Sequence, residues 1–317
     1  MLAYVVRRLL HFIPVVLLAS LVIFIGMRLA PGDPAELLAG PDPSPATLAA
    51  IRARLGLDQS LALQFLYWLR DAATGDLGRS MVNGLPVGEL VLQRLGATLE
   101  LAVAGLLLSL VIGGALGVAA GLRPNSAFDR VVAGFSAVGL SLPLFWTGIL
   151  LILWFSVGLG WFPVGGRAPL SAGILPALSS LALPALTVAI GNAPIIARFL
   201  RNSIVETMKA DHVRAALAKG LPRRVVIRDY VVRNSLIPMV TVAGIILGNL
   251  IGGAALVEIV FSWPGVGQLL VTALGNRDYS VVQGAMLVAI GGFLVANLLV
   301  DVSYGILDPR IRQSHDG

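Results

Sequence analysis

The chain has 317 residues, of which 57% are hydrophobic and only 13% are charged. A soluble protein of this length needs charged side chains over its surface, whereas a membrane protein needs them mainly in loops and at helix ends. The composition therefore excludes an ordinary soluble fold, and the lack of cysteine excludes disulfides and thiolate metal sites.

Six uncharged runs are each long enough to cross a bilayer, which takes about 20 helical residues. They are Leu9–Met27, Leu101–Leu122, Val131–Gly166, Ala168–Ala197, Asn234–Val257 and Tyr279–Val300. We expect one helix from each run, and so an all-α polytopic membrane protein with six transmembrane helices. The long third run is expected to stay one helix that leaves the membrane after Leu159. Pro176 and Pro184 favour a late start of the fourth helix, near Ser179.

The first run follows Arg7 and Arg8, as the apolar core of a secretion signal would. Its apolar stretch is too long for such a signal, and no small-x-small cleavage site follows it, so we expect a retained helix. The expected domains are 1–30 for the N-terminus and first helix, 31–96 for an external loop subdomain, and 97–317 for the remaining helices with a cytoplasmic segment at 198–234.

Lys and Arg are unequally distributed over this topology. With the N-terminus inside, fifteen of them lie on the inner face and eight on the outer face. The positive-inside rule then places both termini in the cytoplasm. Segment Arg198–Arg233 alone holds nine basic and three acidic residues. Its net charge of +6 is as large as that of the whole chain. This charge indicates topology and contact with membrane lipid, and we expect no nucleic-acid partner.

The first external loop is predicted to have structure of its own. Pro31–Pro34 and Pro41–Pro45 are typical of turns, whereas Thr47–Leu55 and Leu61–Ala73 have helical patterns that each end at a glycine. The loop is either a cap packed on the helix ends or a docking platform for an external partner.

The cytoplasmic segment contains a predicted helix, elbow and second helix. Apolar residues recur at helical spacing from the fourth run onward: Val205, Met208, His212, Val213, Ala216 and Leu217. Gly220 and Pro222 then predict a glycine cap and a stop, and Arg223–Arg233 a second short helix. The first helix has a small-residue surface formed by Ala210, Ala215, Ala216 and Ala218. The device either docks in a groove on another protein or lies on the lipid surface.

Two of the expected helices carry glycines at four-residue spacing, which places each set on one face. The sets are Gly113, Gly117 and Gly121 in the second helix, and Gly244, Gly248 and Gly252 in the fifth. Each ridge serves either packing within the chain or an interface with another subunit.

Several kinds of chemistry are absent from the sequence. A phosphate-binding loop needs Gly directly before its Lys, but Lys209 follows Met and Lys219 follows Ala. The three His residues lie in different regions, so we expect no metal site, no catalytic residues and no cofactor in this chain. None of the runs has an ionisable residue at its centre, as an ion-coupled carrier would. Asn249 and Asn297 are the deep polar side chains, and they either bond helix to helix or line a translocation path.

Motifs along nearly the whole chain together resemble the permease subunits of bacterial ATP-binding-cassette importers, in the dipeptide, oligopeptide, nickel and glutathione branch. The stretches that carry this resemblance are Tyr4–Leu9, Ala30–Pro34, Leu55–Asp58, Gly75–Ser80, His212–Leu221, Arg233–Pro238, Phe261–Gly267, Arg277–Tyr279, Asn297–Asp301 and Asp308–Arg310. One position departs from the broad importer motif, because Arg214 stands where that motif has Glu. The peptide branch is similar to this sequence at that position.

The resemblance implies a type I importer permease in the bacterial cytoplasmic membrane that translocates peptides, glutathione or a nickel chelate. It implies a second homologous permease, two ATPase subunits that bind ATP and Mg²⁺, and an external solute-binding protein. The implied ATPase-coupling residues are Ala210, Asp211, His212, Arg214, Ala215, Ala216, Lys219, Gly220 and Leu221. The implied binding-protein docking residues are Asp76, Arg79, Ser80, Trp263 and Asp278. An ion-coupled secondary carrier and a membrane-embedded scaffold or enzyme are the competing hypotheses.

Overall fold

The computed structural model describes residues 2–29, 33–40 and 43–307, and within these ranges it is helical without a β-strand. The predicted turns at Pro31-Gly32 and Pro41-Asp42 and the motif Asp308–Arg310 lie outside the described residues. The chain forms two compact units. The first unit contains Thr98–Trp263 and the chain from Phe293, and the second contains Leu2–Ala97 and Pro264–Gly292.

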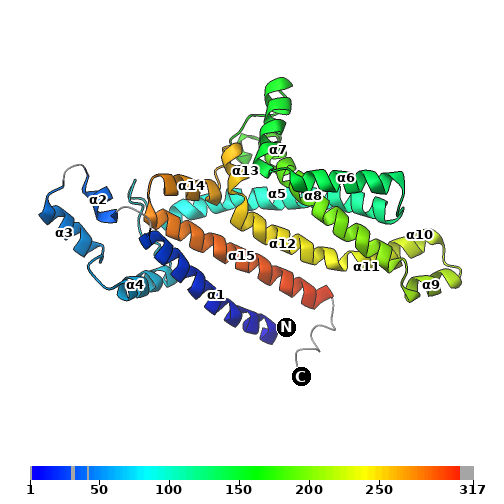
Figure 1. Cartoon of the computed structure of the whole chain (residues 1–317), viewed down its shortest axis with the longest axis horizontal. Helices are drawn as coiled ribbons and strands as arrows, with labels where there is room; N and C mark the ends of the chain where they lie inside the picture. The colour runs from blue at the N-terminus through cyan, green and yellow to red at the C-terminus, as the bar shows by residue number, and fades with distance from the viewer. Residues whose placement is uncertain (1, 30–32, 41–42, 308–317) are drawn as a thin grey trace. The chain divides into compact units, whose positions relative to one another are not determined.

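Four described helices are long and apolar enough to cross a membrane (Figure 1). These helices are α1 (Leu2–Leu29), α5 (Val87–Gly121), α8 (Ile174–Thr207) and α15 (Tyr279–Leu307). Two further pairs of helices pass the same test but are bent. Counting each bent pair as one span gives up to six spans among the described residues, the number that the sequence predicts.

The first bent pair corrects the prediction of one helix from the third run. Helix α6 (Ala127–Ser141) is followed by α7 (Leu144–Leu151), which continues as a π-helix over Ile152–Gly158, and the second part is bent by 103° from the first. Pro143 has no N–H to continue the helix and disfavours helical backbone at the residue before it. Leu142 accordingly has extended backbone, with φ −86° and ψ 130°, and the chain turns there.

The predicted start of the fourth helix is also wrong, because α8 begins at Ile174 and not near Ser179. Pro176 lies in the first turn, where backbone N–H groups have no partner within the helix. Pro184 and Pro194 are accommodated inside α8, which is longer than predicted and ends at Thr207.

Helix α8 is central to the first unit, where it packs against α6, α7 and α12 (Ile237–Gly253). It also faces the glycine ridge of α5. A Cβ on Gly113 would lie 2.5 Å from the Ala193 carbonyl oxygen, and a Cβ on Gly117 would lie 2.8 Å from that of Ala197. A Cβ on Gly121 would lie 2.8 Å from Ile204 Cβ. This ridge therefore packs within the chain.

The ridge of α12 is used differently. A Cβ on Gly248 would lie 3.0 Å from the Phe293 ring of α15, so this glycine also serves packing within the chain. Gly252 has nothing within 4 Å of a Cβ position and is exposed. The predicted fifth helix is followed after Ala254 by α13 (Ala255–Val260).

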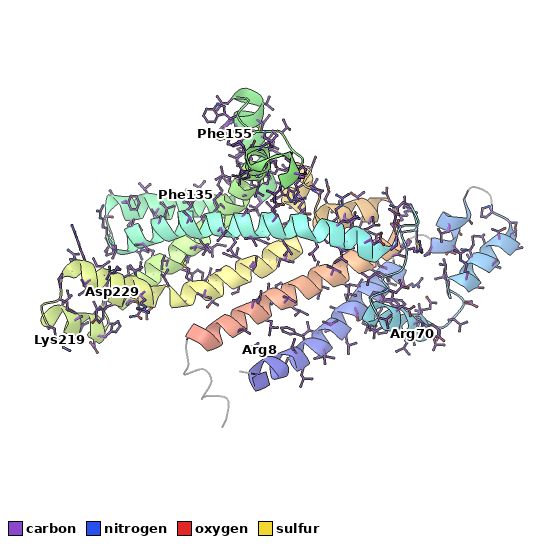
Figure 2. All side chains as sticks on the ribbon, turned by 180° about the vertical axis from the view of Figure 1, so that it is seen from behind. Arg8, Arg70, Phe135, Phe155, Lys219 and Asp229 are labelled. Atoms are coloured by element: carbon purple, nitrogen blue, oxygen red, sulfur yellow. The ribbon has the colours of Figure 1, made fainter. Side chains whose placement is uncertain are left out.

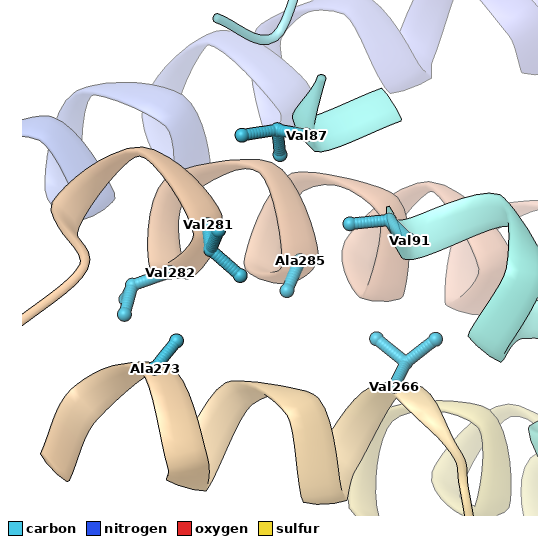
Figure 3. Close-up of a cluster of buried hydrophobic side chains, with 7 residues drawn as sticks. All are labelled: Val87, Val91, Val266, Ala273, Val281, Val282 and Ala285. Atoms are coloured by element: carbon cyan, nitrogen blue, oxygen red, sulfur yellow. The ribbon is translucent and has the colours of Figure 1, made fainter. Parts of the chain in front are cut away.

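Valine side chains dominate the buried cluster of the second unit (Figure 3). Val87 and Val91 come from the start of α5, and Val281 and Val282 from the start of α15. The remaining side chains include Val266 and Ala273 of α14 (Val266–Gly275), a helix that the sequence analysis does not predict.

The external loop belongs to this second unit. The helix predicted at Thr47–Leu55 is α3 (Pro45–Arg54), and the one predicted at Leu61–Ala73 is α4 with the same bounds. Helix α4 packs on α1 through the rings of Phe65 and Trp68, whose centroids lie 5.4 and 6.1 Å from that of Phe24.

A short helix, α2 (Pro34–Ala39), forms between the two predicted turns, where no helix is expected from the sequence. Asp33 caps it by accepting a hydrogen bond from Ala35 N, and Arg52 of α3 donates to the same carboxylate at 2.5 Å. Desolvation raises the pKa of Asp33, but the hydrogen bonds and the Arg52 charge outweigh it and hold that pKa below its usual value. The ion pair thus fastens α2 to α3.

Candidate coupling site

The inner segment after α8 folds as a helical hairpin with a sharp elbow. Its first arm is α9 (Asp211–Ala218), and its second arm runs through α10 (Arg223–Val225), a π-helix over Val226–Val232 and α11 (Arg233–Ser235). Figure 2 shows Lys219 at the tip of this hairpin and Asp229 on the second arm. The elbow and the second helix are as predicted from Gly220 and Pro222.

The elbow closes with two backbone hydrogen bonds that need a left-handed residue. Gly220 has φ +78°, its N–H donates to the Leu217 carbonyl, and the Leu221 N–H donates to the Ala216 carbonyl. These bonds form a Schellman motif, in which the residue at the Gly220 position favours glycine because a Cβ is strained at positive φ. Leu221 then packs against the buried cluster that contains Ala216, which fixes the elbow to the body of the unit.

The first arm of the hairpin is fastened by two side chains at a three-residue interval. Val213 and Ala216 are 0% and 4% exposed, and they pack with Leu200 and Ile204 of α8 and with the second arm. Ala216 therefore faces the chain's own core, which corrects its predicted place on a small outward surface. Ala215 and Ala218 do lie outward.

The predicted helix from Val205 through Leu217 is interrupted. Helix α8 ends at Thr207 and α9 begins at Asp211, with Ala210 as its half-buried capping residue. The break lets α9 leave the axis of α8 and fold back beside the second arm. The apolar residues that the sequence places on one helix therefore belong to two helices, α8 and α9.

Polar contacts join the second arm to α8 and to α9. Ser235 Oγ lies 3.2 Å from Thr207 Oγ1, and the Ser203 hydroxyl donates to the Ser235 carbonyl at 3.4 Å. Asn234 Nδ2 donates to the Tyr230 carbonyl and lies 3.5 Å from His212 Nε2. The hairpin is therefore held at its base as well as through its core.

The remaining predicted coupling residues form the solvent face of α9. Its exposed side chains are Asp211, His212, Arg214, Ala215, Leu217, Ala218 and Lys219. Leu217 is 46% exposed, so a large apolar side chain stands among small and charged ones. Arg214 lies 3.6 Å from Asp211 along the same helix and keeps most of its surface free. This face therefore presents one apolar side chain, Leu217, with the basic side chains Arg214 and Lys219 on the same surface. Such a face can dock in a groove on a partner protein.

The predicted docking residues lie in different environments. Asp76 and Arg79 are exposed on the external loop, where Arg79 donates to the Gly84 carbonyl at 3.0 Å. Trp263 is 0% exposed, and Ser80 and Asp278 are 5% and 4% exposed. In this structure, only the first two therefore present their side chains to a partner.

Ser80 and Asp278 form a latch between the external loop and the start of α15. The Ser80 hydroxyl donates to Asp278 Oδ2 at 2.5 Å, and the Met81 N–H donates to Oδ1 at 3.1 Å. A buried carboxylate that loses a donor retains its desolvation cost, so the latch is expected to stabilise the second unit.

Replacing Ser80 by alanine should therefore lower stability by about 1–3 kcal/mol. Asp76→Ala should change it little, because Asp76 is exposed and bonds only within its own turn. Thermal unfolding of the full chain in detergent checks both. Equal melting temperatures for Ser80→Ala and wild type would show that the latch contributes nothing.

The predicted path residues are not brought to a defined site. Asn249 is exposed on α12, and Asn297 is half-buried on α15. Asn297 Oδ1 lies 3.7 Å from the Cβ position of Gly248, the residue before Asn249.

The structure also places buried polar contacts that the sequence analysis missed. Glu258 of α13 is 0% exposed and accepts a hydrogen bond from Thr98 Oγ1 at 2.7 Å. Asp129 of α6 accepts two hydrogen bonds from Arg201 of α8. An isolated charge next to an apolar run is the only sequence signal for either contact. Among the described residues, no group of His, Asp or Glu side chains is arranged to hold a metal ion.

Two family models match this chain over almost all of its length. The model described as the inner membrane component of binding-protein-dependent transport systems matches residues 113–313, and the model of the N-terminal part of such a component matches residues 1–102. The chain belongs to this family. It is therefore the permease of an ATP-binding-cassette (ABC) importer, a multi-pass inner-membrane protein of a class that is not itself enzymatic.

Relatives of the permease match over nearly the whole chain. A probable peptide ABC transporter permease, y4tP of Sinorhizobium fredii, is 40% identical over 98% of this chain and 99% of its own length. The glutathione transport system permease GsiC of Salmonella choleraesuis is 40% identical with the same coverage. The methionine ABC transporter MetNI, in inward-facing conformations, shares the fold at 22% identity, with a TM-score of 0.56 over 69% of this chain and 96% of that chain.

Proposed function

We propose that this permease imports short peptides or glutathione delivered by an external solute-binding protein. The proposal is supported by the two relatives named as peptide and glutathione permeases, each 40% identical across 98% of the chain. Peptide import is the more general of these activities, and it accounts for both relatives.

We propose further that the working assembly has two permeases and two ATPases. One homologous permease would complete the passage, and ATP and Mg²⁺ would bind the ATPase subunits. The ATPase contact is supported by the packing of α9. Val213 and Ala216 fix this helix to the rest of the chain, whereas Leu217 faces outward. A helix that is packed against the core on one face and exposed on the other can move as a rigid unit when a partner displaces it, because its packing opposes local unfolding.

In this mechanism, closure of the ATPases on ATP moves the α9 hairpin. Because the hairpin is joined to α8 through Thr207 and Ser235, its displacement is passed to the helix on which α5, α6 and α12 pack. The passage then opens outward to receive peptide, and hydrolysis resets it inward.

The orientation proposed here has both termini and the hairpin in the cytoplasm. The chain has no cysteine, so single cysteines are clean probes. Asn83→Cys, on the external loop, should react with a membrane-impermeant thiol reagent in intact spheroplasts. Arg224→Cys, on the hairpin, should react only after the membrane is opened. The reverse order of labelling would contradict the orientation.

Reconstitution tests the function itself. The permease and its partner subunits in liposomes should take up labelled dipeptides or glutathione only with ATP and loaded binding protein. Uptake by the permease alone, driven by an ion gradient, would instead establish the secondary carrier. Mass spectrometry of ligands that copurify with the binding protein identifies the substrate.

A further inference from the structure

A cavity of about 440 Å³ lies between α6 and α8 in the first unit. The two helices lie side by side (Figure 1) and run antiparallel, since Asp129 pairs with Arg201 at one end and a Cβ on Gly139 would meet Pro194 at the other. The volume falls in the range of small-molecule sites, roughly 300–1,000 Å³. Neither the transport mechanism nor the coupling hairpin uses this cavity.

One end of the cavity is strongly basic. Arg130, Arg198 and Arg201 line it, with Asp129 as the single carboxylate. Arg201 is neutralised by Asp129, to which it donates hydrogen bonds of 3.0 and 2.7 Å. Arg130 and Arg198 are exposed and carry the remaining charge, so the mouth is complementary to an anion.

Beyond the arginines and the amides of Asn125 and Asn202, the cavity lining is mainly apolar, with Ser136 as the one hydroxyl among the described lining residues. Ala133, Ala137 and Leu140 of α6 continue it away from the arginines, over a floor that includes the buried Val132 and Ala197. Leu140 lies about 16 Å along the helix from Asp129, at 1.5 Å per residue. An anion without an apolar part leaves this surface unfilled, whereas a lipid with a charged head and an acyl chain covers both ends.

We propose that this cavity binds one anionic phospholipid of the inner leaflet, with its phosphate at Arg130 and Arg198 and an acyl chain along α6. The proposal rests on the cytoplasmic orientation given above, which puts the arginines on the side of the inner leaflet. Basic pockets between transmembrane helices on the cytoplasmic side are suited to such headgroups. A lipid seated there would brace α6 against α8, the helix that carries the coupling hairpin.

Native mass spectrometry of the delipidated full chain tests this site, with phosphatidylglycerol, phosphatidylcholine and inorganic phosphate as separate probes. Wild type should bind phosphatidylglycerol in preference to phosphatidylcholine. The double variant Arg130→Gln/Arg198→Gln should weaken phosphatidylglycerol binding about 30-fold, corresponding to about 1 kcal/mol per arginine.

Two further variants separate the alternatives. Arg223→Gln/Arg224→Gln removes the same charge from the exposed hairpin, outside the cavity, and should bind phosphatidylglycerol as wild type does. Ala137→Trp fills the apolar part from an exposed position and should lose lipid binding while the fold persists. Thermal unfolding checks that each variant is folded.

Three results would overturn the proposal. Equal weakening by the two double arginine variants would show only a general charge effect. Binding of inorganic phosphate as tight as that of phosphatidylglycerol would show a free-anion site. Cross-linking of a cysteine at Ala137 to the second permease in the assembled transporter would show that a protein, and not a lipid, covers the cavity.

Discussion

Gly220→Val is expected to lower coupled transport strongly while leaving the protein inserted and assembled. At φ +78° a β-branched residue costs about 1–2 kcal/mol, although nothing lies within 4 Å of the Cβ position. The strain acts on the backbone of the elbow and opposes the two bonds that close the Schellman motif. The first arm then loses its fixed angle, so ATPase movement no longer reaches α8.

The matched control is Gly56→Val in the external loop. Gly56 has φ +64° and likewise nothing within 4 Å of its Cβ position, so the local strain is similar. Uptake and ATPase stimulation by loaded binding protein should fall in the Gly220 variant and persist in the Gly56 variant. If both variants transport at wild-type rates, α9 is not a coupling element. If both fail equally, strain alone explains the loss.

Adding one methyl group to the α5 ridge should have opposite effects at two adjacent positions. Gly113→Ala places a Cβ 2.5 Å from the Ala193 carbonyl oxygen and 2.8 Å from Ile196 Cβ, and the backbone contact cannot yield by a rotamer change. Overpacking of this kind costs about 1–3 kcal/mol. Gly114→Ala meets only the terminal methyl of Met239 at 3.6 Å, and should be neutral or stabilising by up to about 1 kcal/mol.

Thermal unfolding in detergent distinguishes the two variants, because they share a helix and the same chemical change. We expect a lower melting temperature for Gly113→Ala and an equal or higher one for Gly114→Ala. Equal melting temperatures would mean that α5 does not pack on α8 through this ridge.

Local chemistry allowed some elements to be predicted from the sequence. Helix α4 has the bounds that its apolar spacing and Gly75 predict, and Gly75 has the positive φ of +89° that a residue after a helix end often takes. The elbow was predictable because Gly220 and Pro222 supply the two backbone properties that a helix end requires. Charge-free length predicts six spans, and the described residues have four helices that could span a membrane, or up to six if each bent pair is one span.

Other features depended on tertiary contacts and were not predictable from one sequence. The apolar run containing Pro143 is uncharged throughout and predicts one continuous helix. The structure shows a bend of 103° at this proline, whereas Pro184 is accommodated inside α8. Spacing grouped Ala216 with Ala215, yet the second arm covers the former and leaves the latter free.

Burial was the property least visible in the external motifs. Ser80 and Asp278 are polar residues nearly 200 positions apart, so the sequence alone favours an exposed position for each. In the structure they are buried and hydrogen-bonded to each other. Trp263 is an aromatic residue in a Gly- and Pro-containing loop, where a docking role and a buried anchor have the same sequence pattern.

The most direct test of the account is to identify what touches the free face of α9. Leu217→Cys, carrying a photoactivatable cross-linker, should form a covalent product with the ATPase subunit in the assembled transporter, and the yield should change when ATP is added. Ala216→Cys, one residue away and facing the core, should give little product. Cross-linking of Leu217→Cys to lipid alone, with no ATPase product in any nucleotide state, would contradict the account.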